Sequence, residues 1–504
     1  MYSALFKNEY NLIKKEPSFF KDLRLDIIAN AIFGVKEDSY LIPYFYTKLD
    51  DLDNVLYRQE VFKDFVDKDF YQDFKIYNQH ILNMSTIYHE ILSDSESWVT
   101  RTKLARLMDD YEKTLNDFKY FLTNANIKSK ALISLLEYLN NYLKNDEYLS
   151  FLKEYKLIKN EFTKIKFSLV INGSDIYVSD ESGDIDFSSK VKKISNAFTY
   201  IEDRKIPDEV QFTQTPHIDS SIYDKLRILF KKEFDSFDKF FKNNLNFFNL
   251  EFENIAKEFR FYFCYIAFMD KIKNDELSFS IPTISVDFEE DSQESYDLAL
   301  AYKYYRENKK IITNSYEIKK GEKAIIISGP NQGGKTTFTR QFGQLHYLLS
   351  LGVPIQGKVN KIHLVDNIYT FFKTEENLDN LDGKLKIELE AVKKILANAS
   401  NNSLILFNEI FASTTKDDGL EIANLVLDEI NKLGSFCVFV TFLNELKERK
   451  DVILMCSNVL KDNKEIRTYK ITRAINFDSA YPSSIQAKYG LTYEKIKRRI
   501  SNES

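Results

Sequence analysis

The sequence predicts an α + α/β protein, with long helices first and an α/β sheet domain after them. Two observations predict the helical part: neither glycine nor proline occurs from residue 44 to 172, and neither occurs from 217 to 281. Strand-rich folds need turns every ~8–12 residues, so such stretches favour helices. A third observation predicts the sheet, since short apolar runs bounded by turn residues alternate with helical patterns further on. We expect a helical domain over 1–276 and an α/β domain over 277–504.

The second glycine-free stretch carries the clearest helical period. Its apolar residues step by three and four, which places them on one face of a helix: Ile222, Leu226, Leu229, Phe230, Phe234, Phe237, Phe241, Leu245 and Phe248. Asp219 or Ser220 could cap the start of this helix. We interpret the stripe as a surface that faces the core.

A short β insert is expected between the two helical stretches, near 165–190. Apolar residues at 167–171 and 176–178 flank Asn172-Gly173, a two-residue turn signal typical of a β-hairpin. Pro207 and Pro216 then mark the entry to the next helix.

Composition sets limits on the class of protein. A chain of 504 residues predicts two or three domains. No run of about 18 apolar residues occurs, so we expect no membrane span. Cys264, Cys437 and Cys456 lie far apart, with no metal-ligand spacing, which favours a reducing cytoplasm. The net charge of −6 gives no whole-chain basicity, but 70 Lys and Arg residues leave room for a local DNA-binding surface.

Four apolar runs in the second domain are candidate buried strands, at 324–328, 403–407, 436–441 and 452–456. Directly after the first comes a motif that fits G-x-x-x-x-G-K-[ST], followed by a helical run over 337–351: Gly329-Pro330-Asn331-Gln332-Gly333-Gly334-Lys335-Thr336. Glycines let backbone N–H groups face phosphate oxygens, and the helix N-terminus adds positive potential. In such a loop the lysine reaches the β- and γ-phosphates, and the hydroxyl ligates Mg²⁺. The motif predicts an ATP site in a P-loop domain.

The second candidate strand ends in Asn408-Glu409, where a P-loop site usually has two acids. Glu409 then takes the position of the general base, and a carboxylate without a catalytic part is the alternative. Asn408 can accept a hydrogen bond from Mg²⁺-bound water but brings no charge. One missing charge at about 4 Å is worth at most about 4 kcal/mol at an effective dielectric constant of about 20. We therefore expect metal binding to weaken rather than vanish.

The stretch 327–341 resembles the P-loop of the MutS mismatch-repair ATPases, which reads T-G-P-N-M-G-G-K-S-T with R-Q shortly after. Asn314 falls where that family has an Asn ahead of the loop. Residues 408–419 are similar to its D-E-I-G-R-G-T-S-T-x-D-G, and 487–491 and 496–499 to its closing helix. The resemblance spans about 310–500. It implies an ABC/MutS-type ATPase domain and, more loosely, a lever and core region upstream.

The resemblance assigns roles to particular residues. Catalysis would depend on Glu409 and Lys335, and Mg²⁺ would be held by Thr336 and, through water, by Asn408. The residues expected to bind ATP are Gly329, Pro330, Asn331, Gln332, Gly333, Gly334, Lys335, Thr336, Thr337 and Asn314.

Several positions depart from the MutS pattern. Phe442 stands where the family has His, residues 383–386 lack the Ser sent across the dimer, and Ile311 replaces the aromatic that stacks on adenine. No counterpart of the mismatch-reading domain is found, and Phe288-Glu289-Glu290 matches its Phe-x-Glu wedge by chance. We therefore expect a MutS-like protein that does not read mismatches.

Two functions follow from the resemblance. The first is an ATPase that forms a homodimer through its ATPase domain, with loop 411–419 of one chain closing on the other's phosphates, and that switches arms around double-stranded or branched DNA. The second is a nucleotide-gated binding module with little or no turnover, acting on a protein partner. A different P-loop class, such as a kinase, fits residues 408–419 poorly.

Overall fold

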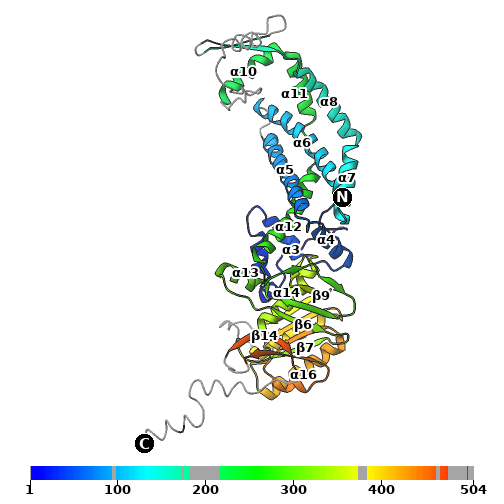
Figure 1. Cartoon of the computed structure of the whole chain (residues 1–504), viewed down its shortest axis with the longest axis vertical. Helices are drawn as coiled ribbons and strands as arrows, with labels where there is room; N and C mark the ends of the chain where they lie inside the picture. The colour runs from blue at the N-terminus through cyan, green and yellow to red at the C-terminus, as the bar shows by residue number, and fades with distance from the viewer. Residues whose placement is uncertain are drawn as a thin grey trace.

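The computed structural model describes residues 2–8, 10–93, 98–172, 175–180, 216–372, 383–460, 466–474 and 497. The molecule is elongated, with a helical arm (the helices and hairpin between residues 68 and 272) at one end and a sheet-containing body at the other (Figure 1). Helices and sheets therefore both form, as the sequence predicts. Over the described ranges, no helix combines the length and apolarity that crossing a bilayer requires.

Seven long helices described in the arm confirm the helical prediction. The turns that lead into α7 and α8 contain neither glycine nor proline, because polar caps start these helices. Ser129 Oγ accepts a hydrogen bond from Leu132 N at 3.4 Å, and the side chain of Asn145 accepts one from Glu147 N. The arm helices are α5 (Lys68–Ser93), α6 (Trp98–Asn124), α7 (Lys130–Leu143), α8 (Asp146–Phe162), α10 (Pro216–Leu229), α11 (Lys231–Asn243) and α12 (Leu250–Ile272).

The apolar stripe of the second stretch is divided between two helices, with Leu245 and Phe248 beyond the end of the second, so the expectation of one continuous helix is wrong. The backbone breaks at Phe230, with φ −113° and ψ 44°. Leu229, beside the break, is 43% exposed, whereas Phe234, Phe237 and Phe241 are buried as expected. Helix α10 starts earlier than expected, at Pro216, so Asp219 and Ser220 lie within it rather than before its first turn.

The predicted hairpin is confirmed by β1 (Phe167–Asn172) and β2 (Asp175–Asp180), which pair antiparallel with Asn172 opposite Asp175. It lies near the outer end of the arm (Figure 1). Gly173 of the turn, residues 181–190 of the insert and Pro207 lie outside the described residues.

A six-stranded sheet forms the centre of the body, and all four predicted strands lie in it. Its order is β10-β11-β12-β7-β13-β14, with every neighbouring pair parallel except β13 and β14. The strands are β7 (Ala324–Ser328), β10 (Ile368–Phe372), β11 (Leu404–Asn408), β12 (Phe436–Val440), β13 (Ile453–Val459) and β14 (Arg467–Arg473).

Helices cover both faces of this sheet, which explains why its strands read as continuous apolar runs. Ile325 and Ile327 join one core cluster with helix α14 (Lys335–Ser350), whereas Ile326 joins a second cluster with residues of the other two helices. These are α15 (Lys384–Asn398) and α16 (Lys416–Leu433). The first cluster continues into the arm and so connects the two ends of the molecule.

Smaller elements complete the body. A second sheet has the order β4-β9-β5-β6, and β3 pairs with β8. These strands and the helix beside them are β3 (Phe279–Ser280), β4 (Thr283–Ser285), β5 (Glu290–Ser295), β6 (Asn314–Ile318), β8 (Ile355–Gln356), β9 (Val359–His363) and α13 (Leu298–Glu307).

The N-terminal segment packs on the body, against helix α14, although the sequence assigned it to the helical domain. The Tyr347 hydroxyl donates to Phe45 O, and Gln344 Nε2 donates to Leu23 O at 2.9 Å. The boundary at 276/277 stays a prediction. The segment contains α1 (Phe20–Leu23), α2 (Leu25–Phe33), η1 (Ser39–Leu41), α3 (Ile42–Tyr46) and α4 (Leu52–Asp64).

Candidate nucleotide-binding site

The glycine-rich loop connects β7, the strand between β12 and β13, to helix α14, so it lies at the carboxyl end of the parallel strands. This end of an open α/β sheet is where ligands bind. Two of its glycines are required by the geometry. Gly334, the N-cap of α14, has φ +92°, which side chains rarely adopt. A Cβ at Gly333 would lie 2.2 Å from Ser457 Oγ, which donates to Gly333 O at 2.6 Å.

A cleft of about 430 Å³ opens beside the loop. Six residues predicted from the motif line it together with the predicted base Glu409 and with Asn314: these six are Gln332, Gly333, Gly334, Lys335, Thr336 and Thr337. Gly329, Pro330 and Asn331 complete the same loop without lining the cleft. The structure thus brings predicted residues from three separate parts of the chain to one cleft.

The Lys335 side chain lies folded against its own loop. Its Nζ donates to Gly329 O and Pro330 O, each at 3.0 Å, and lies 4.5 Å from the centre of the Phe442 ring. Lys335 is buried, and burial lowers its pKa, which the carboxylate of Glu409 counteracts by favouring the charged form. The lysine predicted to reach the phosphates is therefore at the cleft and held by the protein itself.

The two side chains predicted to hold Mg²⁺ are in contact. Thr336 Oγ1 donates to Asn408 Oδ1 at 3.0 Å, from the first turn of α14 to the end of β11. Both atoms are oxygens, the ligand type that Mg²⁺ prefers. The pair offers a neutral site, since Asn408 supplies no charge.

Glu409 follows β11 in a left-handed backbone conformation, with φ 58°, and its N–H donates to Val440 O at 3.0 Å. Phe411, two residues on, has φ 61°. Such conformations in non-glycine residues cost about 1–3 kcal/mol each and cluster at functional sites. The buried carboxylate of Glu388 fixes this turn, since it accepts hydrogen bonds from Phe411 N at 2.9 Å and from Ser413 Oγ at 3.2 Å. No motif in the sequence indicated this residue.

Asn314 ties the start of β6 to β14. Its Nδ2 donates to Tyr469 O at 3.2 Å, and its Oδ1 accepts from Ile471 N at 2.8 Å. Ile311 lines the cleft without an aromatic ring, but two tyrosines that the sequence did not indicate, Tyr304 and Tyr469, line it as well. Tyr469, Glu388 and Ser457 lie far along the chain from the loop, and no short motif marks them.

The remaining departures from the MutS pattern are also located. Gly383 is the N-cap of α15, and the following lysines lie in its first turn. The closing-helix residues 487–491 lie outside the described residues.

Comparisons with known proteins agree with this geometry. Residues 325–497 match the family described as MutS domain V. A DNA mismatch repair protein MutS of Caldicellulosiruptor bescii is 31% identical over 196 residues, which is 37% of this chain and 23% of that protein. An Endonuclease MutS2 of Staphylococcus carnosus is 30% identical over 196 residues, 38% of this chain and 25% of that protein.

The chain therefore spans about a quarter of the length of these curated relatives. The matched part contains the glycine-rich loop, the Thr336–Asn408 pair, Glu409 and five strands of the central sheet in full. The C-terminal region of the chain therefore supports a MutS-family protein, since residues 325–497 match MutS domain V.

Proposed function

We propose that the protein is an ATP-dependent conformational switch that acts on DNA and hydrolyses ATP slowly. One observation carries the proposal: the second half of the loop, with Lys335 and Thr336, lines one cleft with Glu409 at the carboxyl end of the parallel strands. The loop N–H groups and the N-terminus of α14 suit a triphosphate. Mg²⁺ bound at Thr336 and, through water, at Asn408 would neutralise charge on the phosphates, and Glu409 would accept the proton of the attacking water.

Hydrolysis is tested with purified protein in the presence of Mg²⁺. Glu409→Gln should lower phosphate release by about 10²-fold or more, since general-base catalysis contributes about 10²–10⁴-fold. ATP should still bind this variant, whereas Lys335→Ala should lose both binding and turnover. Wild-type turnover no faster than that of Glu409→Gln would reject hydrolysis.

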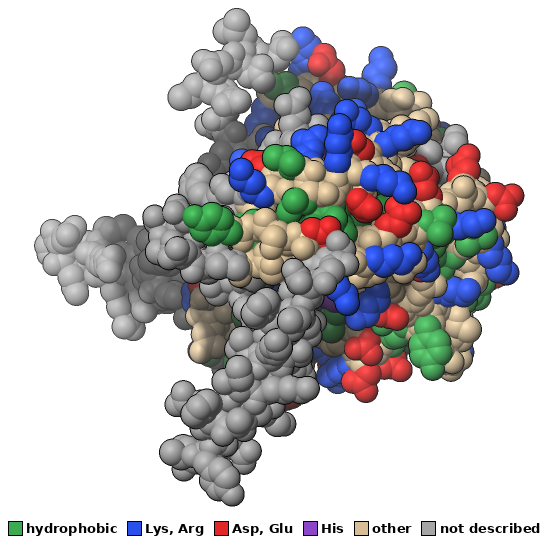
Figure 2. Space-filling model, turned by 90° about the horizontal axis from the view of Figure 1, so that it is seen from above, with side chains coloured by type: hydrophobic (Ala, Val, Ile, Leu, Met, Phe, Trp, Pro, Cys, Tyr) green, Lys and Arg blue, Asp and Glu red, His purple; other side chains and the backbone are tan. Residues whose placement is uncertain are grey.

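DNA is proposed as the ligand of the arms because of the relatives' names and a group of exposed lysines on the outer arm. Figure 2, which shows the molecule from the arm end, has Lys and Arg side chains gathered over much of the described surface, with Asp and Glu among them. Exposed lysines of the outer arm include Lys156, Lys159, Lys164, Lys166, Lys231, Lys232 and Lys239. Such residues suit contacts with the phosphate backbone, which do not read base sequence.

Labelled branched, mismatched and plain duplexes, titrated with and without ATP, test this ligand. We expect branched duplex to bind most tightly and mismatched duplex no better than matched duplex. Affinity should fall steeply with salt, because phosphate contacts release counterions. Equal, negligible binding to all three would remove DNA from the proposal.

Dimerisation through the ATPase domain is part of the same proposal. Loop 411–419 of one chain would close on the phosphates of the other, and Thr415, the N-cap of α16, would be at the contact. Light scattering of Glu409→Gln should show twice the chain mass with ATP. A monomer under all conditions would rule this out.

A cytoplasmic location stays a prediction from the cysteine usage.

The alternative is a nucleotide-gated binding module that turns over little ATP and acts on a protein partner. Two observations favour it. The Thr336–Asn408 pair, predicted to hold Mg²⁺, lacks a carboxylate, and the apolar ring of Phe442 rather than a hydrogen-bonding side chain lies over Lys335. It predicts ATP binding with turnover no faster than that of Glu409→Gln, so the assay described above separates the two functions.

A further inference from the structure

Phe442 has an environment that differs from those of its neighbours in the sheet. The phenylalanines of the adjoining strands, Phe407, Phe436 and Phe439, are fully buried, whereas Phe442 is 42% exposed. The Phe442 ring contacts a charged group, because the Lys335 ammonium lies 4.5 Å from the ring centre. This distance is within the range of a cation–π interaction. The ring therefore acts on Lys335 more than it fills a core.

The Lys335 ammonium is satisfied by the protein before any phosphate arrives. An ammonium has three donors, and two of them already reach Gly329 O and Pro330 O. The Phe442 ring supplies a third favourable contact. A phosphate oxygen that takes this ammonium must compete with all three contacts.

We propose that Phe442 is a positioning residue that latches Lys335 in a phosphate-free arrangement and so sets the affinity of the cleft for ATP. This inference rests on the proposed binding of ATP. The latch consists of the Phe442 ring and the Lys335 ammonium. Binding of a triphosphate moves the ammonium from the ring to the phosphates, which the flexible lysine stem allows.

The ring is held close to the glycine-rich loop on one side. Leu443 N donates to Thr441 Oγ1 at 3.0 Å, which shapes the turn that carries Phe442. Ser328 Oγ donates to Asn444 Oδ1 at 3.1 Å. Ser328 is the last residue of β7, immediately before the loop, so the ring and the loop share one support.

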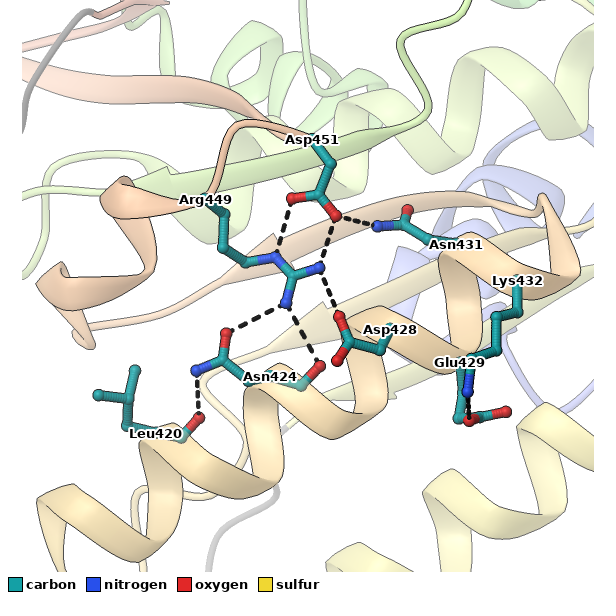
Figure 3. A network of polar contacts seen from close by, with 8 residues as sticks. All are labelled: Leu420, Asn424, Asp428, Glu429, Asn431, Lys432, Arg449 and Asp451. Atoms are coloured by element: carbon teal, nitrogen blue, oxygen red, sulfur yellow. Dashed lines mark hydrogen bonds and ion pairs between the residues drawn. The ribbon is translucent and has the colours of Figure 1, made fainter.

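Phe442 begins the segment 442–451, which follows β12. The far end of this segment is fixed to α16 by Arg449 (Figure 3). Its guanidinium donates to Asp428 Oδ1 at 2.8 Å, to Asn424 Oδ1 at 3.1 Å and, through Nε, to Asp451 Oδ1 at 3.0 Å. Lys416, in the first turn of α16, pairs with Glu445 of the segment. The segment is thus anchored at both ends, so the ammonium leaves the ring rather than the ring following it.

Phe442→Leu tests the latch, with Phe442→Tyr as the matched control that keeps the aromatic face. Losing a partly exposed cation–π contact should tighten ATP binding about two- to fivefold by calorimetry, whereas Phe442→Tyr should bind like the wild type. Phe442→Met is a second ring-free variant and should behave like Phe442→Leu. Unchanged or weaker ATP binding by both ring-free variants overturns the proposal.

A nucleotide-free readout separates this inference from the proposed function. In protein labelled with ¹³C-lysine, assigned with Lys335→Arg, the ring current of Phe442 should shift the Lys335 ε-methylene resonance. The shift should disappear in Phe442→Leu and persist in Phe442→Tyr. Identical resonances in wild type and Phe442→Leu overturn the latch even if ATP binds. Wild-type protein that takes up no ATP refutes the proposed function, while the methylene shift still tests the contact.

Discussion

The arm and the body bury different kinds of side chain. Helix α5 of the arm buries mainly apolar residues, such as Phe74 and Ile81, on one face. Helix α14 of the body is buried on nearly all sides, and its buried residues include Gln341, Gln344 and His346. Each of these three has hydrogen-bond partners in other elements. Helix α5 is therefore held mainly by apolar burial, whereas α14 adds specific polar contacts to its apolar burial.

This difference separates stability from function. Apolar burial is non-directional, so the arm can repack without changing the cleft. A buried hydrogen bond requires one partner in one place. Helix α14 starts at the cleft and ends against the N-terminal segment, so a change in its polar contacts should alter both stability and ATP binding.

The largest effect is expected from a core phenylalanine of the arm. Phe259 is 1% exposed, and its ring centre lies 4.7 Å from that of Phe74. Phe259→Ala should lower the free energy of unfolding by about 3–5 kcal/mol, and Phe259→Leu by about 1 kcal/mol. Urea unfolding followed by circular dichroism measures both. ATP affinity should change less than twofold, and a larger change would show that apolar packing within the arm also affects the cleft.

The next effect concerns Gln344 in the body. Gln344→Leu keeps the bulk but leaves Leu298 N and Leu23 O without the partners that lie 2.8 and 2.9 Å away. An unsatisfied buried group costs about 1–3 kcal/mol, so we expect about 2–4 kcal/mol. Unlike Phe259→Leu, this variant should also weaken ATP binding. Calorimetry with unchanged ATP affinity would show that α14 does not link the cleft to the N-terminal segment.

Glu253 is one of the buried polar residues of the arm, together with Asn78 and Ser85 of α5. Burial would raise its pKa, but hydrogen bonds from Lys257, Ser85 and His89 outweigh burial and lower the pKa to about 2. A pKa below the unfolded value of 4.5 means that the stabilisation is complete above about pH 4.5 and is lost as the pH falls toward 2. Solvent screens the half-exposed Lys257 and His89, so we expect about 1–2 kcal/mol.

Unfolding of wild type and Glu253→Gln between pH 2 and 7 measures this contribution. The difference between the two proteins should shrink as the pH falls below about 4.5. A constant difference across the range would mean that the charge of Glu253 does not stabilise the arm.

The smallest effect compares two ion pairs of α16 drawn in Figure 3. Arg449 is 14% exposed and binds several partners, whereas Lys432 and Glu429 form a single pair and are 72% and 55% exposed. Arg449→Lys keeps the charge but loses the forked geometry, and should cost about 1 kcal/mol. Lys432→Ala should lower the melting temperature less than Arg449→Lys does. Equal shifts in melting temperature would show that the Arg449 cluster is ordinary surface.

The local chemistry of the chain determined much of the fold and the position of the site. The strand before the loop, the glycines and Lys335 are neighbours in sequence, so a short motif defines the phosphate-binding geometry. The turn signal at Asn172-Gly173 located the hairpin strands, and the absence of glycine and proline located the arm helices. These features depend on backbone preferences within a few residues, which is the range over which a sequence can be read directly.

Other features were decided only by the tertiary structure. The packing of the N-terminal segment on α14, the anchoring of Phe411 by Glu388 and the Phe442 ring over Lys335 each join residues far apart in the chain. The helix break at Phe230 likewise escapes a reading of apolar period, which continues through it. Such contacts depend on which elements the sheet order and core packing bring together, and no local preference of the residues involved encodes that choice.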